Sequence, residues 1–220
     1  MCARFSLAGP ERLADRYPDF RLRGSGSRRY NIAPTETVLA ARSDGDIVPL
    51  RWGLVPFWAK DVSIGQKLIN ARAETLAEKP AFRHALKSRR CLVFADGYYE
   101  WTGLKGKKQP YRFTVDDGSP FAFAGLWESW GREESRIETC TIVTCAPNEL
   151  CASIHDRMPA ILDDGALDAW LHGDVAEALD AIVPYDAARM RQTAVTPEMN
   201  HHAFDDPRCI EPLAVAATLF

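Results

Sequence analysis

Short stretches rich in β-branched and aromatic residues recur along the chain, and turn-forming Gly, Asp and Ser residues separate them. Stretches of this kind are typical of β-strands. The pattern predicts strands at residues 37–41, 47–54, 91–101, 111–115, 121–127 and 137–145. We therefore expect β-sheet to dominate the middle of the chain.

Helical spacing of apolar residues occurs in four shorter segments, at 10–17, 75–86, 165–171 and 175–182. Asp163 and Asp174 precede the last two segments and are candidate N-terminal caps. The helices do not alternate regularly with the strands, which favours an α+β fold. No repeat or long linker divides the sequence, so we expect one domain over residues 1–220.

The composition supports a globular protein, because 46% of the 220 residues are hydrophobic. No stretch approaches the roughly 18 consecutive apolar residues of a membrane helix, and residues 1–6 do not resemble a secretory signal. We expect a cytoplasmic protein without a membrane-spanning segment. Six cysteines in such a chain do not suggest a disulfide framework.

The net charge of −3 conceals an uneven distribution. Residues 1–112 hold 21 Lys and Arg against 11 Asp and Glu, whereas residues 113–220 hold 6 against 19. The two halves therefore carry net charges of +10 and −13. A basic first half is what a polyanion-binding face requires, although biased composition without a continuous patch would look the same.

Cys2 is a candidate for unusual reactivity, because removal of Met1 would leave an α-amine and a thiol on adjacent carbons. In an unperturbed chain their pKa values are about 7.7–8.0 and about 8.5, so part of each is nucleophilic near neutral pH. The amine can form a Schiff base with an aldehyde, and the thiol can close on that imine to give a thiazolidine. Alternatively, a small residue at this position merely permits removal of methionine.

Asn70 and Arg72 stand two positions apart in a mostly apolar run. In an extended segment they project to the same face, where Asn70 could orient a substrate oxygen and Arg72 could hold a phosphate. The alternative is the entry of a helix, with Arg72 paired to a surface acid.

Glu100 lies between two aromatic residues in the predicted strand 91–101. Such surroundings desolvate a carboxylate and raise its pKa, which suits it to proton transfer. It could equally be a buried partner of an arginine. Asp96 and Gly97 indicate a bulge or turn in the same run.

His155 follows the predicted strand 137–145 after a short connection, and histidine titrates in the physiological pH range. It could move protons or polarise a sugar hydroxyl, although a lone histidine is more often structural. Cys140, Cys145, Cys151 and His155 are potential zinc ligands, but the chain has no Cys-x-x-Cys knuckle. Phosphate-binding glycine loops are also lacking, so we expect neither metal nor cofactor.

Pro56, Phe57 and Trp58 follow an apolar run that is flanked by cations. Burying all three at a strand exit would be awkward, and exposed aromatics beside cations suit base stacking. Core packing is the alternative. If the aromatic residues stack on bases, the phosphates would be held by Arg4, Arg28, Arg29, Arg51 and Arg72.

Six of these segments together resemble the SRAP family, the SOS-response-associated peptidases or abasic-site-processing proteins. They occur in the family's order at residues 1–5 (MCARF), 30–35 (YNIAPT), 51–56 (RWGLVP), 69–75 (INARAET), 90–101 (RCLVFADGYYEW) and 154–159 (IHDRMP). The family usually has Gly after the cysteine, where this chain has Ala3. The resemblance implies a single α+β domain with a β-rich, barrel-like core and peripheral helices.

The resemblance also implies roles for individual residues. Cys2 would form a crosslink to abasic sites in single-stranded DNA, Asn70 and His155 would position the substrate and handle protons, and Glu100 would be the acid or base. Arg4 and Arg72 would hold the DNA backbone, with Thr144 as a further pocket hydroxyl. Pro56, Phe57 and Trp58 would form a wedge that opens the strand.

The sequence therefore predicts a DNA-damage protein with lyase-like crosslinking activity, acting as a monomer in the cytoplasm and at the nucleoid. A rival interpretation uses Cys2 as the nucleophile of an N-terminal-nucleophile peptidase or amidohydrolase, including cleavage of Met1. A binding module without chemistry would explain the basic first half. It would not explain the set Cys2, Asn70, Glu100 and His155.

Overall fold

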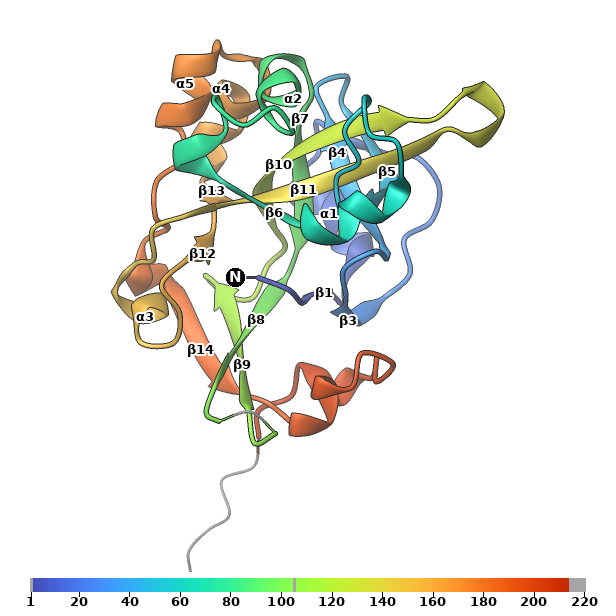
Figure 1. Cartoon of the computed structure of the whole chain (residues 1–220). Helices are drawn as coiled ribbons and strands as arrows, with labels where there is room; N and C mark the ends of the chain where they lie inside the picture. Colours follow the sequence, from blue (N-terminus) through green and yellow to red (C-terminus); the bar gives the residue numbers. More distant parts are fainter. Residues whose placement is uncertain (1, 105, 214–220) are drawn as a thin grey trace, which may run out of the picture.

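Five strands close into a barrel at the centre of the computed structural model, which describes residues 2–104 and 106–213 (Figure 1). Around the ring, antiparallel pairs join β11 to β10, β10 to β7, β7 to β4 and β4 to β5. Strand β5 then pairs in parallel with β11 and closes the ring. The strands are β4 (Thr37–Arg42), β5 (Asp46–Trp52), β7 (Arg90–Ala95), β10 (Phe121–Trp130) and β11 (Ile137–Cys145).

Large apolar side chains fill the core, and aromatic residues are prominent among them. The rings of Phe5 and Trp52 lie 5.0 Å apart, and those of Phe5 and Phe123 lie 5.8 Å apart, both edge to face. All three side chains are fully buried. Such pairs add to the stabilisation from apolar burial, so the N-terminal strand is anchored in the core through Phe5.

A second sheet of five strands packs against the barrel in the order β14, β9, β8, β1, β3 (Figure 1). Strand β1 pairs antiparallel with β8 on one side and with β3 on the other. The first residues of the chain are therefore held next to β8. The strands are β1 (Phe5–Leu7), β3 (Arg29–Ile32), β8 (Gly97–Thr102), β9 (Gln109–Val115) and β14 (Met190–Ala194).

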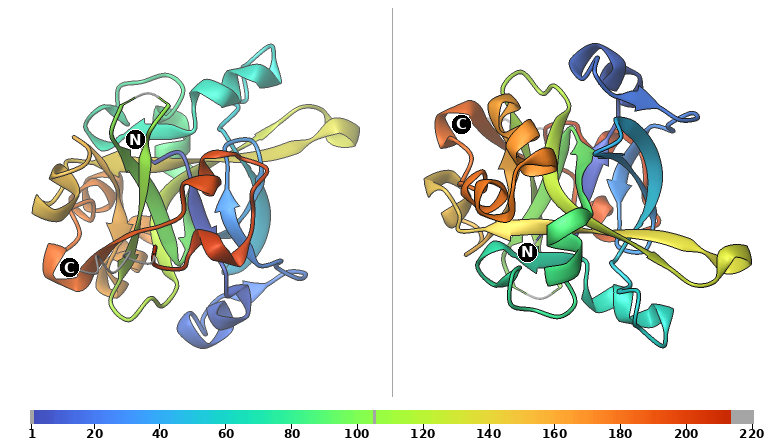
Figure 2. Two further views of the ribbon diagram at one scale, coloured as in Figure 1. Left: turned by 90° about the horizontal axis from the view of Figure 1, so that it is seen from below. Right: turned by 90° about the horizontal axis from the view of Figure 1, so that it is seen from above.

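Four short strands extend the margins of the barrel sheet. Strand β6 pairs with β11 in parallel, β12 pairs with β11 antiparallel, β13 pairs with β10, and β2 pairs with β5. Their bounds are β2 (Arg21–Leu22), β6 (Asn70–Arg72), β12 (Met158–Pro159) and β13 (Ile161–Leu162). The β10–β11 hairpin projects from the body of the molecule (Figure 2).

The helices are short and peripheral, which together with the barrel confirms the expected α+β class. They are α1 (Leu13–Arg16), α2 (Arg83–Ser88), α3 (Glu149–Ala152), α4 (Leu167–His172) and α5 (Val175–Asp180). No helix within residues 2–104 and 106–213 is long and apolar enough to cross a membrane.

The predicted helix at 75–86 is wrong over most of its length. A 3₁₀ turn covers Ala73–Thr75, and the α-helix begins only at Arg83. Pro80 explains the difference, because proline lacks an N–H donor and disfavours helical conformation in the residue before it.

The two predicted caps have different outcomes. Asp174 accepts hydrogen bonds from the N–H groups of Ala176 and Glu177, in a capping box that confirms the prediction. Asp163 stands at the start of the 3₁₀ turn Asp164–Ala166, but its side chain makes no cap hydrogen bond. It pairs with Arg189 instead, at 2.5 Å.

Five of the six predicted strands are confirmed to within three residues at their ends, but the strand at 91–101 is wrong as a single element. It is divided into β7 and β8, which belong to different sheets. The division lies at Asp96, as the turn signal indicated. The buried Asp96 carboxylate accepts hydrogen bonds from the Ser6 hydroxyl at 2.7 Å, the Ala8 N–H at 2.5 Å and the Arg112 guanidinium at 2.9 Å.

This arrangement predicts a large stability cost for Asp96→Asn. The substitution leaves the largely buried Arg112 without its ion-pair partner, so we expect a loss of about 3 kcal/mol in the free energy of unfolding. Urea unfolding measures it as a lower midpoint with an unchanged m-value. The control is Asp117→Asn, because Asp117 is exposed and bonds only locally to Ser119. Equal urea midpoints for the two variants would show that the buried Asp96–Arg112 ion pair does not stabilise the fold.

Candidate active site

Cys2 lies just before β1 and is fully buried. Its backbone carbonyl accepts a hydrogen bond from Asn70 Nδ2 at 2.7 Å, and its Sγ lies 3.7 Å from the Arg4 carbonyl. Asn70 begins β6, whose parallel pairing with β11 fixes its place. Strand pairing therefore positions both partners of the Asn70–Cys2 contact.

The environment of the Cys2 thiol differs from the sequence expectation. Burial, followed by the negative charge of Glu100, raises the pKa of this thiol well above its ordinary value. Burial therefore shifts the thiol away from the partial ionisation that an unperturbed chain would show near neutral pH. The effect of Glu100 also shows that its carboxyl is close enough to act on the sulfur.

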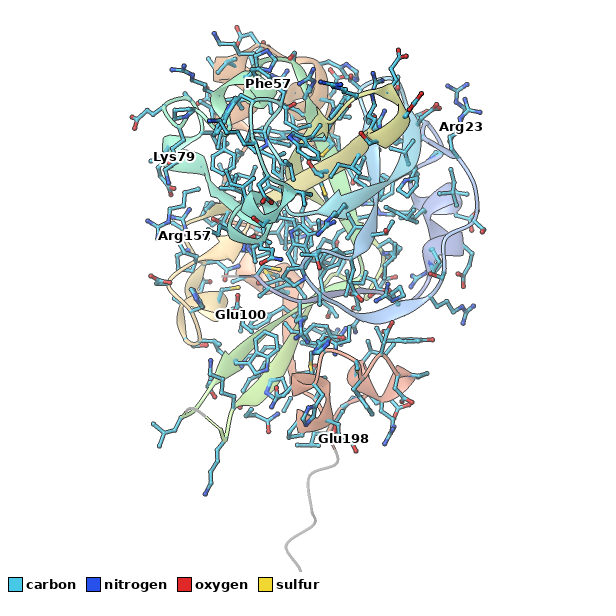
Figure 3. The ribbon with its side chains drawn as sticks, turned by 45° about the vertical axis from the view of Figure 1, so that its right-hand side comes forward. Arg23, Phe57, Lys79, Glu100, Arg157 and Glu198 are labelled. Carbon is cyan, nitrogen blue, oxygen red and sulfur yellow. The ribbon has the colours of Figure 1, made fainter. Side chains whose placement is uncertain are left out.

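Glu100 lies in β8 with only 6% of its surface exposed (Figure 3). Burial raises the pKa of its carboxyl, while the charges of His155 and Lys108 act in the opposite direction. The predicted desolvation of Glu100 is confirmed, and its role in proton transfer stays a prediction.

His155 follows α3, and its backbone N–H donates to the backbone carbonyl of Cys151. Its Nδ1 accepts a hydrogen bond from the Arg157 N–H at 3.0 Å and lies 2.8 Å from Asp156 Oδ1. The first contact uses Nδ1 as an acceptor and the second requires a hydrogen on Nδ1, so the two contacts are alternatives. The ring is held in place in both.

These contacts bring the four candidate catalytic residues into one site. Asn70 bonds to Cys2, the charge of Glu100 acts on the Cys2 thiol, and the charge of His155 acts on Glu100. They come from the N-terminal segment, β6, β8 and the turn after α3. The site therefore exists only in the folded chain.

Sequence reasoning missed two residues beside this site. The Tyr98 hydroxyl and Cys151 Sγ are 3.0 Å apart and buried, and the Tyr98 ring stacks on Phe113. Tyr98 precedes Glu100 by two positions in β8, so both side chains face the same side of the sheet. That spacing was the available signal. Cys151 was considered from the sequence only as a potential zinc ligand, and nothing there points to its contact with Tyr98.

Arg157 was also missed. Its guanidinium makes a bidentate ion pair with Glu74, at 2.6 and 2.9 Å, and donates to the Thr144 carbonyl at 2.6 Å. It thereby joins the turn after β6, the end of β11 and the segment that carries His155.

Arg4 and Arg72 lie on different parts of the surface near the site. Arg4 is partly buried and donates to Asn31 Oδ1 at 3.0 Å. It borders a pocket of about 510 Å³, and Arg72 is exposed at the end of β6. The extended conformation predicted for Asn70 and Arg72 is confirmed. The pocket is lined by Ala3, Arg4, Trp101, Gly106, Lys108, Pro197, Asn200 and His201.

The residues expected to contact DNA differ in exposure. Thr144 is fully buried, with its hydroxyl 3.5 Å from the Ala71 carbonyl, and its role as a pocket hydroxyl stays a prediction. Pro56 is buried as well. Phe57 and Trp58 are 54% and 48% exposed, so the aromatic part of the predicted wedge is on the surface.

Two hydrogen bonds support the segment that carries these aromatics. Val55 N–H donates to Thr139 Oγ1 at 2.9 Å, and Trp130 Nε1 donates to the Ala59 carbonyl at 2.7 Å. The two partners outside the segment, Thr139 in β11 and Trp130 in β10, belong to the β10–β11 hairpin. The hairpin therefore fixes the position of Phe57 and Trp58.

The zinc set considered from the sequence is not assembled. Across residues 2–104 and 106–213, no three His, Cys, Asp or Glu side chains are grouped as metal ligands. Each of the six cysteines has a free thiol.

Comparison with known proteins finds relatives that match nearly the whole chain. Residues 1–202 match the family model for SOS response associated peptidase (SRAP). Abasic site processing protein YoqW of Bacillus subtilis is 42% identical, over 96% of this chain and 99% of that protein. Abasic site processing protein HMCES of mouse is 32% identical, over 96% of this chain and 71% of that protein.

A crystal structure of a protein from Bacteroides thetaiotaomicron has the same fold. It superimposes with a TM-score of 0.88 at 27% identity, covering 97% of this chain and all of that one. The family match, the sequence identities and the shared fold agree, and the chain belongs to the SRAP family.

Proposed function

We propose that the chain processes abasic sites by binding single-stranded DNA and capturing the open-chain aldehyde on Cys2, after removal of Met1. The names of its relatives support abasic-site processing in general terms. The observation that carries the chemistry is the position of Cys2. Asn70 holds its carbonyl, and the buried Glu100 carboxyl acts on its thiol.

Capture proceeds in balanced steps. An abasic sugar is mostly a closed hemiacetal, so a proton leaves the C1′ hydroxyl and another reaches the ring oxygen as the aldehyde is released. The α-amine of Cys2 adds to the aldehyde carbon, and loss of water gives an imine. The thiol then adds to the imine carbon while its proton passes to nitrogen. The product is a thiazolidine, and one water molecule is released.

Glu100 and His155 are the groups that would move these protons. Because burial raises the pKa of Glu100, its carboxyl is more readily protonated than an exposed one and can donate to a leaving water or to the ring oxygen. While Nδ1 of His155 accepts from the Arg157 N–H, the second ring nitrogen of the neutral imidazole carries the hydrogen and can donate it in a hydrogen bond to a sugar oxygen. Asn70 keeps the Cys2 backbone in place throughout.

The same residues could serve a peptidase, with the α-amine of Cys2 as base. In either reaction the nitrogen of Cys2 accepts the thiol proton, so the raised pKa of this thiol does not separate the two. The names of the relatives refer to abasic site processing. We therefore favour DNA crosslinking over hydrolysis of external peptides.

The first prediction concerns the N-terminus. Only a free α-amine can form the imine, so an N-terminal tag or retained Met1 should abolish the crosslink. Cys2→Ser keeps the amine, and we expect a borohydride-reducible imine with little stable adduct. Denaturing gels and intact mass would measure both products.

Substrate controls sharpen this experiment. Abasic single strands should react much faster than abasic duplex, and a tetrahydrofuran analogue should bind without crosslinking, because it cannot open to an aldehyde. Adduct with the analogue, or stable adduct from a blocked N-terminus, would exclude aldehyde capture.

The second prediction concerns Glu100→Gln. Affinity for undamaged single strands should stay within about threefold, because phosphate contacts supply most of that affinity. Adduct formation should slow by about 10²-fold, the lower end of general acid–base contributions. Rapid quenching at saturating DNA separates the two effects. If Glu100→Gln formed the adduct at the rate of the parent, Glu100 would have a structural role and no role in proton transfer.

Stability offers an independent check on the same variant. The folded state raises the pKa of Glu100, so ionising this carboxyl costs stability as the pH rises through the raised value. Glu100→Gln should therefore gain stability relative to the parent at pH 8, and the difference should shrink below about pH 4, where the carboxyl is protonated in both states. Urea unfolding at the two pH values measures it. A constant difference would contradict the pKa direction.

The third prediction concerns phosphate binding. Arg72→Ala should weaken binding to single strands with or without a lesion, and should reduce the slope of log affinity against log salt by about 0.7. Arg132→Ala is the control, since Arg132 is an exposed cation on the β10–β11 hairpin. Salt titrations by fluorescence anisotropy measure both. Equal slopes for the two variants would remove Arg72 from the DNA path.

A further inference from the structure

An exposed pair of rings lies on the surface beside the predicted wedge. The rings of Phe57 and His84 have centroids 5.2 Å apart and are tilted by 56°. Phe57 is 54% exposed, and the side chain of His84 is 53% exposed. Two adjacent rings left in water have apolar faces available for a ligand.

His84 is held from below by a buried carboxylate. Its Nδ1 lies 3.6 Å from Glu128 Oε1, and the side chain of Glu128 is only 2% exposed. Arg89 donates to the other carboxylate oxygen. The imidazole therefore has the Glu128 carboxylate on one side and the Phe57 ring on another.

Three exposed cations lie close to His84 along the chain. Arg83 and Lys87 are exposed one helical turn apart on α2, and Lys79 is exposed just before the helix. Glu78 is the one acid among residues 76–90. Aromatic rings beside a row of cations are the combination that binds single-stranded nucleic acid without regard to sequence.

Phe57 and the site residue Glu100 can be followed in one view of the molecule. Figure 3 shows Phe57, Lys79, Arg157 and Glu100 in that order from top to bottom. An exposed cation, Lys79, therefore appears between Phe57 and Glu100 in this view.

We propose that Phe57 and His84 form a stacking platform for a base on one flank of the lesion, while the cations of α2 contact the adjoining phosphates. This inference rests on the proposed function, because it assigns one flank of the same DNA strand. Glu128 acts as a positioning residue that keeps the imidazole beside Phe57. The platform would secure the strand at a distance from the reacting sugar.

The first test uses undamaged oligonucleotides that carry 2-aminopurine, whose fluorescence reports stacking. His84→Ala should weaken binding about fivefold and reduce quenching, whereas His84→Phe should bind within about twofold of the parent because it keeps a ring. His172→Ala is the matched control, an exposed histidine at the end of α4. Parent affinity and quenching for His84→Ala would overturn the platform.

The second test uses lesion position. Two abasic oligonucleotides would carry the lesion near the 5′ end or near the 3′ end, so that each lacks one flank. At limiting DNA, His84→Ala should slow crosslinking about fivefold on one oligonucleotide and leave the other unchanged. Equal slowing on both, or on neither, would overturn the assignment to one flank.

The two proposals fail in different ways. If the parent protein never crosslinks abasic DNA, while His84→Ala still weakens binding and quenching on undamaged strands, the proposed chemistry fails and the platform stands. If the parent crosslinks normally and His84→Ala binds like the parent, the chemistry stands and the platform fails. Circular dichroism of His84→Ala and His84→Phe shows that both variants are folded.

Discussion

The buried carboxylate of Asp96 is the constraint on which the candidate site depends. It joins β1 to the start of β8 through the Ser6 hydroxyl, the Ala8 N–H and the Arg112 guanidinium. These contacts fix where the N-terminal strand lies beside the strand that carries Glu100. The first residues of a chain usually fray. Here β1 is paired on both sides and anchored through Phe5, so Cys2 keeps a defined position.

Most local features of this fold could be predicted from the sequence, and the long-range closures could not. Runs of β-branched and aromatic residues, together with turn signals, located most strands, and the apolar setting of Glu100 correctly indicated a raised pKa. Barrel closure depends on the parallel pairing of β5 with β11, which joins residues about ninety positions apart and leaves no local pattern. The two-sheet division at Asp96 was visible only as a turn.

The burial of individual side chains at the site depends on packing that the sequence does not show. The exposure of Phe57 and Trp58 could be anticipated, because three bulky residues in a row are awkward to bury at a strand exit. The burial of Pro56 depends on packing beneath the segment. Thr144 is a small polar residue in a strand, and sequence alone does not tell whether its hydroxyl faces solvent. Tyr98 and Arg157 join the site through contacts with Cys151, Glu74 and Thr144, which lie in other elements.

The raised pKa of the Cys2 thiol gives the proposed chemistry an order. A protonated sulfur is a poor nucleophile at neutral pH, so it would rarely be oxidised or alkylated before substrate arrives. The α-amine can react first, because forming an imine needs no thiolate. The imine then offers both an electrophilic carbon and a basic nitrogen within one bond of the thiol. Sulfur attack and proton transfer can occur together, so the burial that keeps the thiol inert does not prevent ring closure.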